Sequence, residues 1–198
     1  MFNISKFFLL TTKARQFVWL LCLIISVCFS SLYAQDNSIK VVLDSQQNGG
    51  YIVSASFTIT ANTQLVWDTL SDYSAISTYV KGMKISRIIT SNPTKIIEQK
   101  WQTNIMFIPI ITSVNLIIKE VQGERISFRS LTSDTFEYYF GEWQIKSKGN
   151  QSEVLYNLSV RPKITAFNFL IDGVLNENIK DLMEDVKIEI ERRLIKSK

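Results

Sequence analysis

The candidates for a general acid or base in this chain are Asp72, Glu98, Tyr138 and Tyr156. None of them lies in a recognisable catalytic pattern, and the simplest interpretation of Asp72 is a helix cap or a local hydrogen bond. The chain has no histidine, the commonest general base and metal ligand. A Ser-His-Asp triad and a Cys/His zinc site are therefore excluded, and the sequence implies no metal and no covalent cofactor.

Aromatic residues indicate a second kind of chemistry, the binding of an apolar molecule. They are concentrated in the middle of the chain, where apolar and polar residues alternate as they do in strands. A mostly apolar cavity with a few polar tips is typical of a small-molecule site, and Tyr and Trp supply such tips. The alternative is that these rings only fill the core. The residues that we expect to bind ligand are Trp101, Phe107, Phe128, Phe136, Tyr138, Trp143, Tyr156, Phe167, Ile171 and Val174.

Residues 1–34 have the layout of a secretory signal peptide. Basic residues precede an apolar run, Phe17 to Phe29, and small residues lie before Gln35. The run is short for a membrane-spanning helix, although an uncleaved anchor remains an alternative. Both cysteines of the chain lie within this run, so residues 35–198 contain no disulfide and no thiol. We expect a periplasmic or secreted protein whose residues 35–198 form one domain.

The charge of the chain does not indicate nucleic acid as a partner. The full chain carries 22 basic and 18 acidic residues, for a net charge of +4. Cleavage after Ala34 would remove three basic residues and no acidic one, which leaves a nearly neutral domain. A nucleic-acid-binding surface needs clustered Lys and Arg, and no such cluster precedes the C-terminus.

The order of expected elements is a strand, two short helices, further strands and one long helix. Strands are predicted at 51–61, 84–90, 95–104, 113–121, 125–131, 135–146 and 153–161, from alternation and turn signals. Asn62 or Thr63 can cap the first short helix. In the strand at 135–146 the alternation changes phase at Gly141, which predicts a β-bulge there. Apolar residues at helical spacing predict the long amphipathic helix over about 165–195.

The most unusual segment is the apolar run at residues 105–111, which lies where a hairpin tip should be polar. Three interpretations are open. The segment covers a cavity as a lid, it makes transient contact with a membrane through Phe107 and Ile108, or it extends both strands into the core or a dimer interface. The sequence does not choose between them.

Several short motifs resemble the polyketide cyclase/dehydrase and coenzyme Q-binding branch of the START-like (SRPBCC) superfamily. The resemblance covers about residues 51–195, and its motifs include Phe57-x-Ile-x-Ala, Val66-Trp67-x-x-Leu70-x-Asp72-Tyr73 and Gly141-Glu142-Trp143. It implies an α+β helix-grip fold, in which a curved antiparallel sheet wraps around a long C-terminal helix. It also implies a cavity between sheet and helix, but no catalytic residue. One departure is Lys81, near a position where the family usually has proline.

The function that this resemblance implies is the binding of an apolar small molecule, a lipid or a quinone-like compound. The signal-like layout of residues 1–34 predicts that the domain is exported. A cyclase/dehydrase-type enzyme and a protein-interaction module with a filled core are the alternatives. A buried carboxylate or tyrosine pair in the cavity would favour the enzyme, a wholly apolar cavity would favour a carrier, and a missing cavity would favour the interaction module. The sequence does not name the ligand or the oligomeric state.

Overall fold

The computed structural model describes residues 38–105, 108–163 and 168–197. The predicted signal peptide, Phe107 and Phe167 lie outside these residues. The strands are β1 (Lys40–Ser45), β2 (Tyr51–Ile59), β3 (Met83–Thr90), β4 (Lys95–Ile105), β5 (Ile108–Val121), β6 (Arg125–Ser133), β7 (Phe136–Lys148) and β8 (Gln151–Pro162). The helices are α2 (Thr63–Leu70), α3 (Ile76–Tyr79) and α4 (Asn168–Lys196). None of the helices in the described residues is long and apolar enough to span a membrane.

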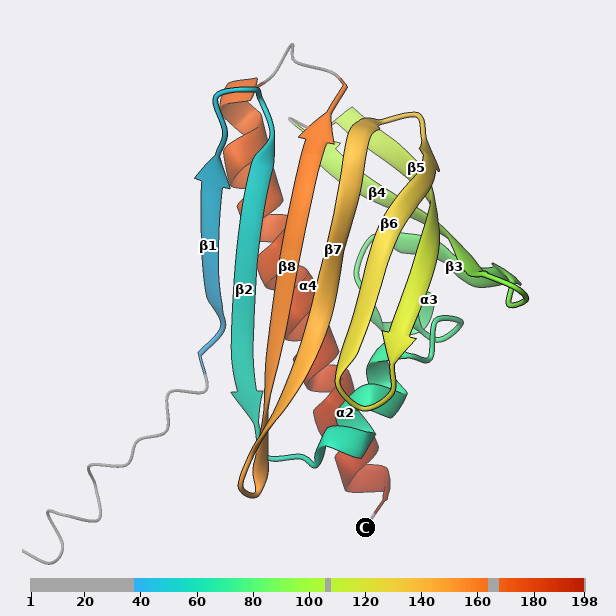
Figure 1. Ribbon diagram of the computed structural model, residues 1–198. Coiled ribbons are helices and arrows are strands. Elements are labelled where there is room, and N and C mark those ends of the chain that lie inside the picture. The colour runs from blue at the N-terminus through green and yellow to red at the C-terminus, as the bar shows by residue number, and fades with distance from the viewer. Residues whose placement is uncertain (1–37, 106–107, 164–167, 198) are drawn as a thin grey trace, which may run out of the picture. The chain divides into compact units, whose positions relative to one another are not determined.

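The strands form one eight-stranded antiparallel sheet in the order β1-β2-β8-β7-β6-β5-β4-β3. The sheet curves around α4, which runs behind β2, β8 and β7 in Figure 1, while β3 to β5 bend toward the viewer's right. Helices α2 and α3 lie on the same side of the sheet, and α2 contacts the C-terminal part of α4. The predicted α+β helix-grip architecture is therefore confirmed.

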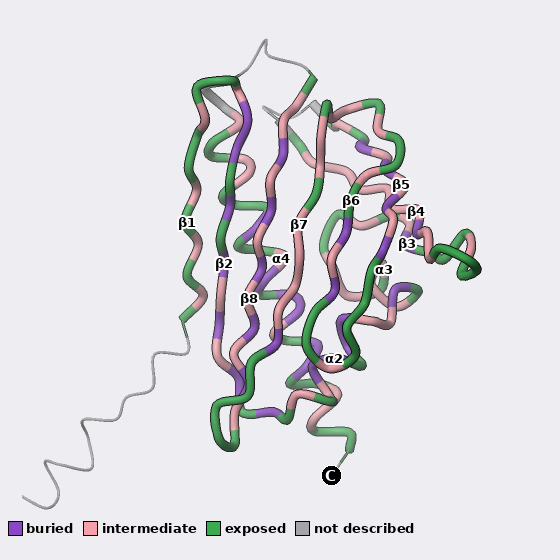
Figure 2. The backbone as a smooth tube through the Cα atoms, viewed as in Figure 1, coloured by how far each residue is buried: buried purple, intermediate pink, exposed green. Residues whose placement is uncertain are grey.

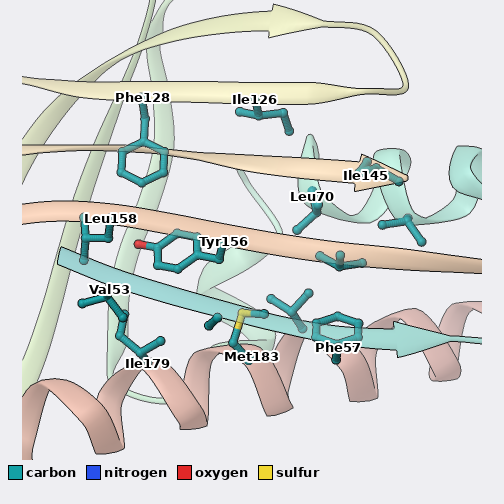
Figure 3. Close-up of a cluster of buried hydrophobic side chains, with 14 of the residues drawn as sticks. Val53, Phe57, Leu70, Ile126, Phe128, Ile145, Tyr156, Leu158, Ile179 and Met183 are labelled. Atoms are coloured by element: carbon teal, nitrogen blue, oxygen red, sulfur yellow. The ribbon is translucent and has the colours of Figure 1, made fainter. Parts of the chain in front are cut away.

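The concave face of the sheet and α4 share one hydrophobic core. Buried and exposed residues alternate along β2, as Figure 2 shows, so that Val53 and Phe57 face the helix while Ile52 faces solvent. Met183 of α4 meets this face between Phe57 and Ile179 (Figure 3). Asn62 caps α2, because its side chain accepts a hydrogen bond from the Leu65 amide at 2.8 Å. The predicted core face of β2 is thus the observed one.

The β-bulge in β7 lies at a different residue from the predicted one. The pairing of β7 with β8 shifts between Phe136 and Tyr138, whereas Gly141 pairs in regular register with Leu158. Gly141 serves another purpose: a Cβ atom built on it would lie 2.7 Å from Cζ of Phe128. The same Cβ atom would overlap the Asn157 backbone carbonyl oxygen on β8, so the glycine is required mainly by the close approach of the two strands. The earlier bulge changes which residues of β7 point inward.

The apolar run at 105–111 extends two strands. Pairing of β4 with β5 continues to the last pair, Ile105 with Ile108. On β5, Ile110 points inward and lines the internal cavity, whereas the side chain of Ile111 is 67% exposed. The paired residues of the run therefore extend β4 and β5, and this extension is compatible with a membrane contact of the run.

Candidate ligand-binding site

A cavity of about 370 Å³ lies between α4 and the concave face of the sheet. Its wall is formed by side chains from α4, from β3 to β8 and from the segment that contains α2 and α3. Most of these side chains are apolar, with Ile97, Leu116 and Leu158 on the sheet side and Leu182 on the helix side. A volume of a few hundred Å³ with an apolar wall is typical of sites for small organic molecules.

Six aromatic rings form a continuous band across one wall of the cavity. Neighbouring ring centroids are separated by 4.5 to 6.3 Å, within the range of favourable aromatic contacts. The band runs in the order Trp101, Phe136, Tyr139, Phe128, Tyr156 and Trp143. Because the rings come from four different strands, the curvature of the sheet brings them together. The band presents a polarisable aromatic surface to any ligand, with neighbouring rings inclined by 20° to 46°.

Two tyrosine hydroxyls lie within this band. The oxygen atoms of Tyr139 and Tyr156 are 3.5 Å apart, and the Tyr156 side chain is only 2% exposed. Figure 3 shows the Tyr156 ring projecting from its strand toward the space beside Leu158. Burial raises the pKa of both phenols above the usual value of 10. Both hydroxyls therefore stay protonated over the physiological pH range and can donate hydrogen bonds.

The most exposed part of the described wall lies between the loop after α3 and the middle of α4. Of the described lining residues, only Lys81, Asn178 and Asp181 are exposed, and all three lie where the loop after α3 faces the middle of α4. The Asn178 amide donates to Oγ1 of Thr103 on β4 at 3.3 Å. A Cβ atom on Gly82, whose φ is +76°, would lie 2.7 Å from the Gln102 carbonyl oxygen, so this loop closely approaches β4. We call this group of residues the mouth of the cavity.

The segment around α2 and α3 closes another part of the cavity with Leu70, Tyr73, Ile76 and Tyr79. The Tyr73 hydroxyl donates to Oε1 of Glu120 at 2.5 Å, and Lys95 Nζ lies 2.6 Å from the same carboxylate. Burial would raise the pKa of Glu120, but the hydrogen bonds from Lys95 and Tyr73 outweigh it and lower this pKa. Tyr73 is therefore held in place by an ionised partner.

The structure brings most of the predicted binding residues together. Those that line the cavity are Trp101, Phe128, Phe136, Trp143, Tyr156, Ile171 and Val174. Tyr138 does not line it: its ring contacts Phe140 at 5.8 Å and its hydroxyl lies against Gly50. Tyr139 takes the predicted place of Tyr138, because the bulge between Phe136 and Tyr138 turns the chain by one residue.

Two of the predicted acid/base candidates are held in ion pairs away from the cavity wall. Asp72 accepts from Nη2 of Arg193 at 2.9 Å. Glu98 lies 2.6 Å from Arg87 and 3.3 Å from Lys100, and hydrogen bonds from these two residues lower the pKa of its carboxyl group. Among the described residues, no group of three or more His, Cys, Asp or Glu side chains is placed to hold a metal ion.

The fold and the cavity define a class of protein, the helix-grip proteins with an internal apolar cavity. Residues 59–187 match the family described as polyketide cyclase/dehydrase and lipid transport. This match spans more than half of the chain, so the chain belongs to that family. No curated protein matches the sequence.

Solved structures share the fold at low sequence identity. The Zhui aromatase/cyclase from a Streptomyces species has 15% identity and a TM-score of 0.64, with 73% of this chain and 96% of that chain covered. A START superfamily protein from Mycobacterium smegmatis has 15% identity and a TM-score of 0.61, with 71% and 97% covered. A STAR-related lipid transfer protein from Xanthomonas axonopodis has 10% identity and a TM-score of 0.54, with 76% and 98% covered. At such identities the likeness shows the fold alone.

Proposed function

We propose that this protein binds an apolar small molecule, a lipid or a quinone-like compound, in the cavity between the sheet and α4. The observation that carries the proposal is the cavity of about 370 Å³ with its aromatic band. Burial of ligand in such a wall contributes roughly 25 cal/mol for each Å² of apolar surface removed from water. Sequestration of the ligand from water is thus the mechanism.

The family and the shared fold support this proposal. The family description includes lipid transport, and one structural neighbour is a lipid transfer protein. A filled core, the premise of an interaction module, does not agree with the cavity. Ligand would enter and leave through the mouth, where Lys81, Asn178 and Asp181 are exposed.

We place this binding activity outside the cytoplasm. The proposal rests on the signal-like layout of residues 1–34, which would direct the domain to the periplasm or to secretion. Contact with a membrane through the hairpin at residues 105–111 would let the domain exchange an apolar ligand with lipid. The exposed side chain of Ile111 beside the inward-facing Ile110 supports this part of the proposal.

The buried tyrosine pair favours a second candidate, an enzyme of the cyclase/dehydrase kind. Two protonated phenols in an apolar wall can polarise a carbonyl oxygen of a substrate. Their raised pKa values make them donors rather than bases at neutral pH. A base would have to come from elsewhere: of the described lining residues, only Asp181 has a carboxylate, and it lies exposed at the mouth. The cavity wall therefore fits a ligand carrier better than it fits an enzyme.

The test is native mass spectrometry of the purified protein, followed by solvent extraction and identification of any bound molecule. The variant Val174→Phe narrows the cavity from α4, and Val121→Phe makes the same substitution on an exposed residue away from the wall. We expect a co-purifying apolar molecule in the wild type and in Val121→Phe, and about tenfold less in Val174→Phe, since overpacking excludes ligand. An empty wild-type protein that also fails to bind fluorescent fatty acids would refute the proposal.

A further inference from the structure

The Tyr139 and Tyr156 hydroxyls have unused hydrogen-bonding capacity inside an otherwise apolar wall. Each phenol carries one O–H donor and can also accept. When one hydroxyl donates to the other, across 3.5 Å, the second O–H needs a further acceptor. Within residues 38–105, 108–163 and 168–197, no hydrogen bond other than this one involves either hydroxyl. A buried donor without a partner is costly, roughly 1–3 kcal/mol.

We infer that the ligand presents a neutral oxygen acceptor, such as a ketone or quinone carbonyl, to the Tyr139–Tyr156 pair. This inference rests on the proposed function and specifies the chemical class of the ligand. In the complex, one tyrosine donates to the ligand oxygen and the other donates to the first tyrosine. A chain of two hydrogen bonds in apolar surroundings polarises both members, so each bond is strengthened.

The surroundings of the pair select a neutral acceptor over a carboxylate. The rings that contact the two tyrosines belong to Trp101, Phe128, Phe136 and Trp143 and carry no charge. Of the described lining residues, Lys81 is the only cation, and it lies exposed at the mouth. An ionised carboxylate at the pair would lose its hydration without gaining a cation, which is strongly unfavourable. A charged group on the ligand would therefore lie at the mouth, and the carbonyl at the tyrosines.

The test compares two rigid probes of nearly the same shape, 9-fluorenone, which has a ketone, and fluorene, which does not. Equilibrium dialysis gives the dissociation constant of each probe. The contribution of apolar burial is nearly the same for both probes, so it cancels in the ratio of the two constants. The double variant Tyr139→Phe/Tyr156→Phe removes both donors and keeps both rings. The double variant is needed because either single variant leaves one hydroxyl free to bind the ketone. Tyr138→Phe is the matched control, since that hydroxyl lies against Gly50 outside the wall.

We expect the preference for fluorenone over fluorene to fall about fivefold in the double variant and to stay unchanged in Tyr138→Phe, because one hydrogen bond contributes roughly 0.5–1.5 kcal/mol. The preference should also be constant between pH 5 and 9, since both phenols remain protonated. If both probes bind and the ratio of their dissociation constants is the same in the wild type and the double variant, this inference is overturned and the proposed function stays intact. Failure of both probes to bind the wild type would overturn both.

A second measurement needs only the wild-type protein and so does not depend on the folding of a variant. A carbonyl that accepts a hydrogen bond has a lower C=O stretching frequency than the same carbonyl in an apolar solvent. We expect the infrared band of protein-bound fluorenone to lie below its position in hexane. A bound-state band at the hexane position would show that the ketone has no donor and would overturn the inference.

Discussion

The two ends of α4 pack against the sheet in different ways. Toward its C-terminus, Met183 and Ile190 are fully buried and contribute to the closed core with β2 and α2. Toward its N-terminus, Ile171 and Val174 are only partly buried and line the cavity. One helix therefore has two roles: Met183 and Ile190 pack into the closed core, whereas Ile171 and Val174 face a space that can hold a ligand.

Polar contacts reinforce the C-terminal part of the helix as well. The carboxylate of Glu189 accepts from Nε of Arg192 at 2.6 Å and from Nε of Arg193 at 2.8 Å, although its side chain is only 4% exposed. Arg193 also donates to Asp72, just after α2. Glu189 thereby orients the arginine that ties α4 to the short helices.

The largest effect should come from truncating the same residue type at the two ends of α4. Ile190→Ala leaves a cavity in close-packed surroundings and should lower the free energy of unfolding by about 2–5 kcal/mol. Ile171→Ala enlarges a cavity that already exists, so the loss should be about 1 kcal/mol or less. Urea unfolding monitored by circular dichroism measures both. Equal losses would show that the two ends of the helix are anchored equally.

A smaller loss of stability is expected from neutralising Glu189, whose carboxylate accepts hydrogen bonds from both Arg192 and Arg193. Glu189→Gln should lower the free energy of unfolding by about 1–3 kcal/mol at pH 7, because charge-assisted hydrogen bonds of a buried group are lost. Glu191→Gln, two residues further along and exposed, is the control and should change it by about 0.5 kcal/mol or less. If the free energy of unfolding fell by the same amount in both variants, the contact of Glu189 with the two arginines would have no special role in stability.

The pH dependence tests the same contact. Hydrogen bonds from Arg192 and then Arg193, against the opposing effect of burial, lower the pKa of Glu189 to about 2 from 4.5. Because the unfolded state binds the proton more tightly, this contribution is complete above about pH 4.5 and is lost as the pH falls toward 2. The difference in unfolding free energy between wild type and Glu189→Gln should therefore shrink over that range. A difference that stays constant down to pH 2 would argue against ionic stabilisation.

The smallest loss of stability is expected from the contact between α4 and the loop at the mouth. Asp185 accepts from the Lys81 backbone amide at 2.7 Å, while Lys81 Nζ lies 3.7 Å from the same carboxylate. Asp185→Ala should cost about 1 kcal/mol through the lost backbone hydrogen bond. Lys81→Ala should cost about 0.5 kcal/mol or less, because exposed ion pairs contribute little. Chemical denaturation distinguishes the two, and a larger loss in Lys81→Ala would contradict this assignment.

Most of the fold could be predicted from the sequence because its signals are local. Alternation predicted the buried face of β2, and Asn62 was one of two predicted caps for α2. Helical spacing predicted α4, and the motifs predicted the order of elements. The same alternation placed Trp101, Phe128 and Tyr156 on the concave face, where they line the cavity.

What only the tertiary structure decided was which neighbouring residue faces the ligand and where the cavity opens. Tyr138 and Tyr139 are adjacent tyrosines, and the position of the bulge, set by pairing with β8, selects Tyr139 for the wall. The mouth joins Lys81 and Asn178, nearly a hundred residues apart in the chain. Periodicity is a property of neighbouring residues and can be read along the sequence. Bulge position and cavity shape depend on packing between distant segments, which the folded structure alone brings into contact.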